Sequence, residues 1–299
     1  MGASGRIRLI VSGDDFGMSP GTNAGILEAY RKGILRQASL MVAGDAAEEA
    51  VAAALREPGL AVGLHLVLVQ GRSALPPYAA LPLVDFSGEF PKNPVAAGVR
   101  YFFRRSLRDV LRREIRAQLE AFSATGLPLS HVDGHLTIHL HPVVLDVLCD
   151  LAPRYGIRAV RVPREPLLEA LRFDRRDFPR KLAEGATFRL LGSYARRRLR
   201  RAGIFFADRV YGMHQSGRVD ERYLLFLSTR LPEGVTELYG HPAYADEGVR
   251  RWTPTYDREE ELRALCSPRV REALESRGVV LSSYADLVGS CLPSAGVGE

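Results

Sequence analysis

The sequence is poor in cysteine, in lysine and in long apolar runs. Its three cysteines, Cys149, Cys266 and Cys291, are widely separated, which argues against a disulfide framework and against a thiolate metal site. No segment reaches the apolar length that crosses a bilayer, and a strand pattern begins near the N-terminus without a signal-peptide layout. We therefore expect a cytoplasmic protein, with peripheral contact at the inner membrane as an option.

Arginine takes the place of lysine almost throughout, and the arginines are unevenly distributed. Lysine occurs only at positions 32, 92 and 181, and the net charge is +6. Residues 100–116 hold seven arginines against two acids, and residues 158–201 hold fourteen basic residues against five acids. The densest group is Arg196, Arg197, Arg198, Arg200 and Arg201. This group predicts a patch that contacts an anionic membrane surface, with a solvated helix face as the alternative. No nucleic-acid motif accompanies the charge, so no nucleic-acid partner is expected.

Strand-like and helix-like segments alternate along the chain, with short connections. Strands are expected at residues 8–12, 37–42, 60–68, 129–135, 158–162, 204–210, 235–239 and 279–282, and the last long helix at residues 258–277. This alternation predicts an α/β fold with about seven parallel strands in a TIM-like (β/α) barrel, closed or nearly closed. We expect a single domain over residues 1–290. It would include a long loop or lid at 70–98 and a helical, arginine-rich insertion at 164–203, followed by a flexible tail at 291–299.

Two adjacent carboxylates, Asp14 and Asp15, follow the apolar run of residues 8–12. An unpaired buried carboxylate is costly, so such a pair indicates that one member binds a cation and the other handles a proton. We assign Asp15 to a metal ion and Asp14 to proton abstraction from water. A helix N-cap is the alternative, although Ser19 already supplies one.

A histidine-rich stretch follows a later strand. His131, Asp133, His135, His139 and His141 share one parity, so an extended backbone would project them from one face. His65 ends another apolar strand and is a further ligand candidate, although a lone buried histidine is commonly structural. Imidazole and carboxylate ligands suit one divalent ion, with zinc the best match and magnesium or another ion as alternatives. The surplus side chains, among them His131, Asp133 and His139, would contact the substrate or the metal ligands.

Three further residues at predicted strands carry candidate roles. His241 could protonate a departing amine, and a turn residue stacked on Pro242 is an equal alternative. Arg158 and Arg161 need anionic or polar partners if their strand is buried. Arg161 could orient Asp14 or bind substrate hydroxyls, and a structural salt bridge is the alternative.

Together these motifs resemble the YdjC-like carbohydrate deacetylases. The matching elements are Asp-Asp-Phe-Gly, Gly-Leu-His-Leu, the His-x-Asp-x-His-x-x-x-His run, Val-Arg-Val-Pro and Gly-His-Pro, in the family's order over residues 8–245. The resemblance implies a (β/α) barrel, a divalent cation and removal of acetate from an N-acetylated sugar. By position, Asp14 resembles the family's base, and Asp15, His65 and His135 resemble its metal ligands. His241 resembles another histidine of the family's site.

Within that family, the Ser-Gly-Asp-Asp-Phe-Gly start and the arginine-rich insertion look most like the hopanoid-biosynthesis-associated branch, HpnK. That resemblance implies an N-acetylglucosaminyl group on a bacteriohopanoid lipid as the substrate. Ser12-Gly13 and Leu136-Thr137 depart from the common family pattern and argue against a chitobiose-type substrate. The alternatives are deacetylation of soluble chito-oligosaccharides, hydrolysis of a phosphoester or O-acetyl ester, and a non-catalytic barrel that binds lipid or nucleic acid. A homodimer also stays open.

Overall fold

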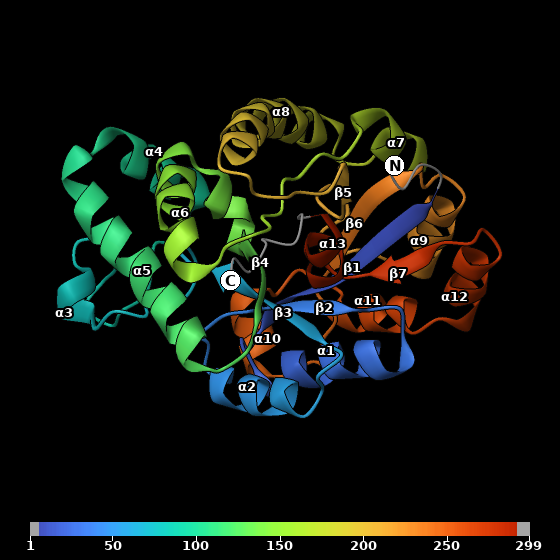
Figure 1. The fold of residues 1–299 in the computed structure, drawn as a ribbon, viewed down its shortest axis with the longest axis horizontal. Helices are drawn as coiled ribbons and strands as arrows, with labels where there is room; N and C mark the ends of the chain where they lie inside the picture. Colours follow the sequence, from blue (N-terminus) through green and yellow to red (C-terminus); the bar gives the residue numbers. More distant parts are fainter. Residues whose placement is uncertain (1–5, 292–299) are drawn as a thin grey trace, which may run out of the picture.

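The computed structural model describes residues 6–291, in which seven strands alternate with helices (Figure 1). The strands are β1 (Ile7–Phe16), β2 (Gln37–Leu40), β3 (Ala61–Leu66), β4 (Leu129–Gly134), β5 (Arg209–Tyr211), β6 (Gly234–Gly240) and β7 (Val280–Ser282). The α-helices are α1 (Pro20–Lys32), α2 (Ala47–Leu55), α3 (Pro77–Ala80), α4 (Pro94–Phe103), α5 (Arg108–Ala124), α6 (Pro142–Tyr155), α7 (Leu167–Phe173), α8 (Phe178–Arg201), α9 (Glu221–Ser228), α10 (Glu247–Trp252), α11 (Arg258–Leu265), α12 (Pro268–Glu275) and α13 (Tyr284–Cys291). Two 3-10 helices are η1 (Arg105–Leu107) and η2 (His135–Leu140). Cys291, the first residue of the predicted flexible tail at 291–299, ends α13, and residues 292–299 lie outside the described residues.

The seven strands form one parallel sheet, as predicted. Their order is β4-β3-β2-β1-β6-β5, and β7 also pairs with β1. One edge of β1 is shared, because β7 pairs with residues 8–10 and β2 with residues 12–16. The other edge pairs with β6 along residues 7–13. β1 is therefore the central strand, and its carboxyl end carries Asp14 and Asp15.

The ring of strands does not close, so the prediction of a TIM-like barrel is confirmed only in part. Within residues 6–291, β4 and β5 end the sheet and do not pair with each other. Residues 158–164 lie between them and are joined to their neighbours by isolated bridges, such as Val132 with Val160 and Ala159 with Phe205. The continuous strands predicted at 158–162 and 204–210 are therefore wrong, apart from β5. Pro163 and Pro166 lack the N–H group that would extend such a ladder.

The connections differ from the prediction in two places. The segment at 70–98 contains α3, the start of α4 and an antiparallel bridge between Arg72 and Glu89. The single helix predicted at 258–277 is two helices, α11 and α12. Ser267 caps the second by accepting a hydrogen bond from the N–H of Val270, and Pro268 occupies its first turn. The helical insertion at 164–203 is present as α7 and α8, which lie on one side of the sheet near β5 (Figure 1).

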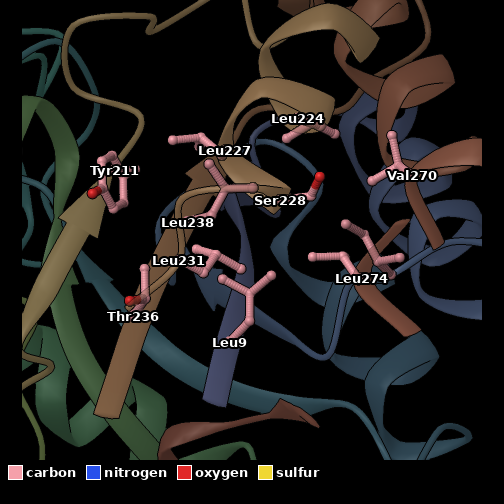
Figure 2. A pocket seen from close by; sticks show the side chains of 11 residues that line it. Leu9, Tyr211, Leu224, Leu227, Ser228, Leu231, Thr236, Leu238, Val270 and Leu274 are labelled. Carbon is pink, nitrogen blue, oxygen red and sulfur yellow. The ribbon is translucent and has the colours of Figure 1, made fainter. Parts of the chain in front are cut away.

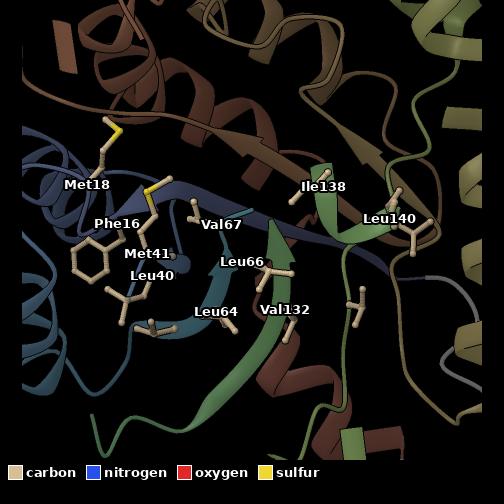
Figure 3. Close-up of a cluster of buried hydrophobic side chains, with 14 of the residues drawn as sticks. Phe16, Met18, Leu40, Met41, Leu64, Leu66, Val67, Val132, Ile138 and Leu140 are labelled. Carbon is tan, nitrogen blue, oxygen red and sulfur yellow. The ribbon is translucent and has the colours of Figure 1, made fainter. Parts of the chain in front are cut away.

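The core fills the space between the sheet and its helices. Buried apolar side chains of β1 to β4, including Phe16, Leu64 and Val132, pack together with Ile138 and Leu140 of the segment that follows β4 (Figure 3). A second apolar space of about 10 Å³ lies between the sheet and helices α9 and α12 (Figure 2). It holds at most one water molecule and is a packing gap. No helix within residues 6–291 is both long enough and apolar enough to cross a membrane.

Candidate active site

Asp14 and Asp15 are both buried at the carboxyl end of β1. Adjacent side chains of a regular strand point to opposite faces. Asp15 departs from that geometry with a φ of 66°, in the left-handed region that a residue with a side chain seldom adopts. The departure allows both carboxylates to reach the same site, where each offers an oxygen close to His65. A strained backbone at such a position is typical of functional sites.

Asp15, His65 and His135 converge on one point. The Oδ1 atom of Asp15 is 3.3 Å from Nε2 of His65 and 3.0 Å from Nδ1 of His135. One ligand atom from each of the three residues lies within 4.8 Å of the others, and all three side chains are buried. With metal–ligand bonds of about 2.1 Å, neighbouring ligand atoms lie about 3.0 to 3.4 Å apart. The donor set therefore fits a divalent metal ion and leaves coordination positions for water or substrate.

The ring of His65 is fixed on its far side. Its Nδ1 atom lies 2.8 Å from Oδ1 of Asp133 and 3.0 Å from the hydroxyl of Ser39. A carboxylate at this position selects the tautomer and leaves Nε2 facing Asp15. Burial alone would lower the pKa of His65, but the carboxylates of Asp133, Asp15 and Asp14 have a larger, opposite effect and raise the pKa to about 10. Because histidine binds a metal ion only as the neutral ring, metal binding at His65 would be coupled to release of its second ring proton.

Arg161 holds Asp14 beside the three candidate metal ligands. Its two terminal nitrogens donate to the two oxygens of Asp14 at 2.6 and 2.8 Å. It also contacts Asp133 and Glu237, each at 2.9 Å, and lies 4.5 Å from the ring centre of Tyr239. Burial lowers the pKa of Arg161, but the three carboxylates raise it well above its usual value. The two parallel hydrogen bonds from Arg161 fix both the position and the orientation of the Asp14 carboxylate.

Two residues of this network were not predicted from the sequence. Arg258 is fully buried at the start of α11 and donates to Oδ2 of Asp15, which leaves Oδ1 for the two histidines. Burial raises the pKa of Asp15, but Arg258, His135 and His65 together hold it well below its usual value. No motif marks Arg258. Glu237, in contrast, is the only acid in the apolar strand β6. A lone acid in a buried strand needs a cation, so the sequence could have indicated Glu237 as a partner of Arg161.

The histidine-rich stretch is extended only as far as Gly134. Leu136 and Thr137 have φ values of 49° and 61°, which turn the chain into η2, so the prediction of one extended face through His141 is wrong. His131 is buried against the ring of Tyr284 and lies 3.6 Å from Asp133. His139 donates through Nε2 to the backbone carbonyl of Arg161 at 2.8 Å. Burial lowers the pKa of His139 to about 4, so this ring is neutral near pH 7.

His241 stands at the carboxyl end of β6 in an aromatic setting. Its ring centre lies 5.9 Å from that of Tyr239 and 5.1 Å from that of Tyr256. Its backbone N–H donates to Glu261, and its Nδ1 lies 3.6 Å from the same carboxylate. Tyr256 also lies beside Arg258, whose guanidinium carbon is 5.6 Å from the tyrosine ring centre. His241 is thus linked to Asp15 through Tyr256 and Arg258.

The remaining predicted arginines lie outside this cluster. Arg158 is exposed, contrary to the expected placement in a buried strand. In the predicted membrane patch, Arg197, Arg200 and Arg201 are exposed and Arg196 is half-buried. Arg198 is paired with Asp146 at 2.8 Å and with Asp150 at 3.5 Å. The patch is therefore partly neutralised.

The chain belongs to the YdjC-like protein family, whose model matches residues 8–276. It is 35% identical over 283 residues to a protein named carbohydrate deacetylase from Geobacillus stearothermophilus, covering 93% of this chain and 96% of that protein. A protein of the same name from Mus musculus is 32% identical over 317 residues, covering 98% of each chain. A chitooligosaccharide deacetylase from Enterobacter sp. (strain 638) is 30% identical over 285 residues, covering 93% of this chain and 98% of that protein. The predicted family is confirmed.

The fold is also similar to that of a solved structure. A crystal structure of an Enterococcus faecalis V583 protein, whose name refers to cellobiose-phosphate cleavage, superposes with a TM-score of 0.74 at 24% identity. The match covers 95% of this chain and 99% of that chain. The arrangement of strands and helices is therefore shared over nearly the whole length.

Proposed function

We propose that this protein is a metal-dependent hydrolase that removes acetate from an N-acetylated sugar. The observation that carries the proposal is the convergence of Asp15, His65 and His135, with Asp14 fixed beside them by Arg161. The names of the carbohydrate deacetylases to which the chain is similar support this reaction class. A non-catalytic binding barrel is not favoured, because it would need neither the strained Asp15 nor the buried donor set.

Each residue of the site has a role in this reaction. When bound, a divalent cation would acidify a water molecule and polarise the acetyl carbonyl. Asp15, His65 and His135 would hold that cation, and one carboxylate with two imidazoles suits zinc best, with magnesium or another divalent ion as alternatives. Asp14 accepts the proton of the attacking water while Arg161 keeps its carboxylate in place. His241 donates a proton to the amine nitrogen as the carbon–nitrogen bond breaks, which gives acetate and a free amino sugar.

We infer that the acetylated sugar is the N-acetylglucosaminyl headgroup of a bacteriohopanoid lipid, as the resemblance to the hopanoid-associated branch implies. In support, Leu136, directly after the candidate ligand His135, has an apolar side chain that is 38% exposed. A lipid-borne headgroup would place the enzyme at the cytoplasmic face of the inner membrane. Soluble chito-oligosaccharides are the second candidate, supported by the 30% identity to the Enterobacter protein of that name.

Acetate release from both substrates tests this proposal. Purified, metal-loaded protein is given N-acetylglucosaminyl hopanoid or diacetylchitobiose, with and without a chelator. We expect turnover of the hopanoid to exceed that of diacetylchitobiose and the chelator to abolish both. Faster turnover of diacetylchitobiose would select the second candidate. Acetate release that persists in the chelator, or no release from either substrate, would overturn the proposed function.

A further inference from the structure

A large cavity lies between the basic insertion and the sheet. Its volume is about 650 Å³, within the range of small-molecule sites. It is lined by the segment that follows residue 162, by helix α8 and by residues in and after β5. Asp15, His65 and His135 do not line it. The cavity is therefore distinct from the candidate metal site.

Part of the cavity lining is apolar. Leu167, Leu182, Phe188 and Met213 contribute it, from α7, α8 and the segment after β5. Leu182 is 49% exposed, and Phe188 and Met213 are half-buried, so these side chains are incompletely covered by the protein itself. An apolar chain placed against them would remove this surface from water, which is favourable.

The cavity also carries positive charge that the protein does not neutralise. Arg164, Arg189 and Arg196 line it, and none of the three is ion-paired with a carboxylate in residues 6–291. Within residues 6–291, the one hydrogen-bond partner of these guanidinium groups is the backbone carbonyl of Asp208, 3.5 Å from a terminal nitrogen of Arg164. Burial, together with the nearby charges of Arg164 and Arg200, lowers the pKa of Arg196, so the charges of Arg164 and Arg196 repel each other. A bound anion would relieve their mutual repulsion.

The acids near the cavity are already engaged. Glu165 lines it, but its Oε1 accepts from the hydroxyl of Tyr223 and its Oε2 from the N–H of His214, both at 3.0 Å. Glu169 lies 3.6 Å from Arg209, the fourth arginine of the lining. The other three arginines keep their charge available.

A residue that lines the cavity is close in sequence to a residue of the candidate active site. Arg164 lines the cavity, and Arg161, three residues earlier, holds Asp14. Three residues span at most about 11 Å of extended backbone. A short piece of backbone therefore joins the cavity lining to the site of the proposed deacetylation, although the cavity's own binding chemistry does not depend on that reaction.

We propose that this cavity binds an anionic amphiphile, an apolar chain that ends in a phosphate or carboxylate group. The chain packs on Leu167, Leu182, Phe188 and Met213, and the anionic group lies among Arg164, Arg189 and Arg196. The ligand is either a single soluble molecule or a lipid whose headgroup lies in a bilayer surface. Both share the same chemistry, and the choice between them is experimental.

Calorimetric titration of the full chain with octyl phosphate, below its micelle concentration, tests the proposal. We expect binding at one site, with inorganic phosphate and 1-octanol each much weaker, because each lacks one half of the ligand. Arg196→Gln and Arg164→Gln should each weaken binding by about tenfold or more, as the loss of a charge-assisted hydrogen bond predicts. Asp15→Asn should bind octyl phosphate as the unchanged protein does, so a failure of the proposed function does not affect this test.

Arg197→Gln is the matched control, because Arg197 is exposed on the same helix and does not line the cavity. Octyl phosphate binding by this variant should be unchanged. If Arg197→Gln weakens binding as much as Arg196→Gln, or if inorganic phosphate binds as tightly as octyl phosphate, the site is only diffuse charge and the proposal is wrong. Flotation with phosphatidylglycerol vesicles then separates the sources: binding that depends on Arg196 indicates a bilayer lipid, and absence of flotation indicates a soluble amphiphile.

Discussion

The metal-site region and the basic insertion use arginine in opposite ways. In the metal-site region each buried guanidinium faces carboxylates: Arg161 contacts Asp14, Asp133 and Glu237, and Arg258 contacts Asp15. In the insertion, Arg164, Arg189 and Arg196 line a cavity without a carboxylate partner in the described residues. Buried and matched arginines fix a geometry, because removing either partner leaves an uncompensated charge. Unmatched arginines at a cavity retain the capacity to bind an anion from outside.

The largest expected effect comes from removing a buried arginine that is paired with carboxylates. Arg161→Ala leaves the buried carboxylates of Asp14, Asp133 and Glu237 without their shared cation. We expect it to lower the free energy of unfolding by about 3–5 kcal/mol, the usual cost of breaking a buried ion pair. Urea denaturation followed by circular dichroism measures this. The exposed Arg197→Ala should change the same quantity by less than about 0.5 kcal/mol. Equal effects of the two changes would show that Arg161 is not matched in the way described.

The second effect separates the proposed base, Asp14, from the candidate metal ligands. Asp14→Asn keeps the size and most of the hydrogen-bonding shape of the side chain but removes its ability to accept the proton of water. We expect kcat for acetate release to fall by about 10²–10⁴-fold, the usual contribution of a general base. Metal content, measured by elemental analysis, should stay the same. A variant with full activity would refute the assignment of Asp14 as the base.

A third, smaller effect concerns the residue that orients Asp15. Arg258→Gln removes the cation at Oδ2 of Asp15 and leaves Oδ1, His65 and His135 in place. We expect metal affinity to fall by about 10–100-fold, as for other partners of metal ligands. Direct titration with zinc measures this affinity, and Arg258→Lys should recover part of it. Unchanged affinity in Arg258→Gln would mean that Arg258 only packs there.

A fourth effect is the pH dependence of metal binding. Since the pKa of His65 is raised to about 10, the ring is positively charged near pH 7, and a metal ion must displace its second N–H proton. Affinity should rise by up to about tenfold per pH unit between pH 7 and 9, with about one proton released. Calorimetry in two buffers of different ionisation enthalpy counts that proton. Affinity that is flat over this range would argue against a protonated His65.

The same raised pKa sets the sign of a stability change in the metal-free protein. The folded state binds the His65 proton more tightly than the unfolded state, whose pKa is near 6.5. Its stabilising contribution is complete below pH 6.5 and is lost as pH rises toward 10. The Tm of chelator-treated protein should therefore fall through this range. His65→Gln should show a smaller fall than the unchanged protein.

Local patterns predicted much of the fold and part of the candidate site. The alternation of strand-like and helix-like segments was enough to place β1 to β4, β6 and β7. In a parallel sheet the carboxyl ends of the strands meet, so the motifs at residues 14–15, 65 and 131–135 were expected to lie together. The structure brings Asp15, His65 and His135 within contact distance.

What the patterns missed is non-local or depends on the backbone. Arg258 contacts Asp15 across 243 residues, and nothing in its own neighbourhood indicates which carboxylate it meets. Parity in the histidine-rich stretch assumes an extended chain, and the left-handed turn at Leu136 and Thr137 breaks that assumption. The opening between β4 and β5 likewise depends on pairing between distant segments, which a run of apolar residues does not specify.

The irregular segment that fills the gap between β4 and β5 also carries Arg161. The backbone N–H of Arg161 donates to the carbonyl of Val132, and its carbonyl accepts a hydrogen bond from Nε2 of His139. Transient detachment of this segment would draw the guanidinium away from Asp14, the proposed base, without displacing Asp15, His65 and His135. Amide exchange rates along residues 158–164 would therefore report how often the enzyme is ready to turn over.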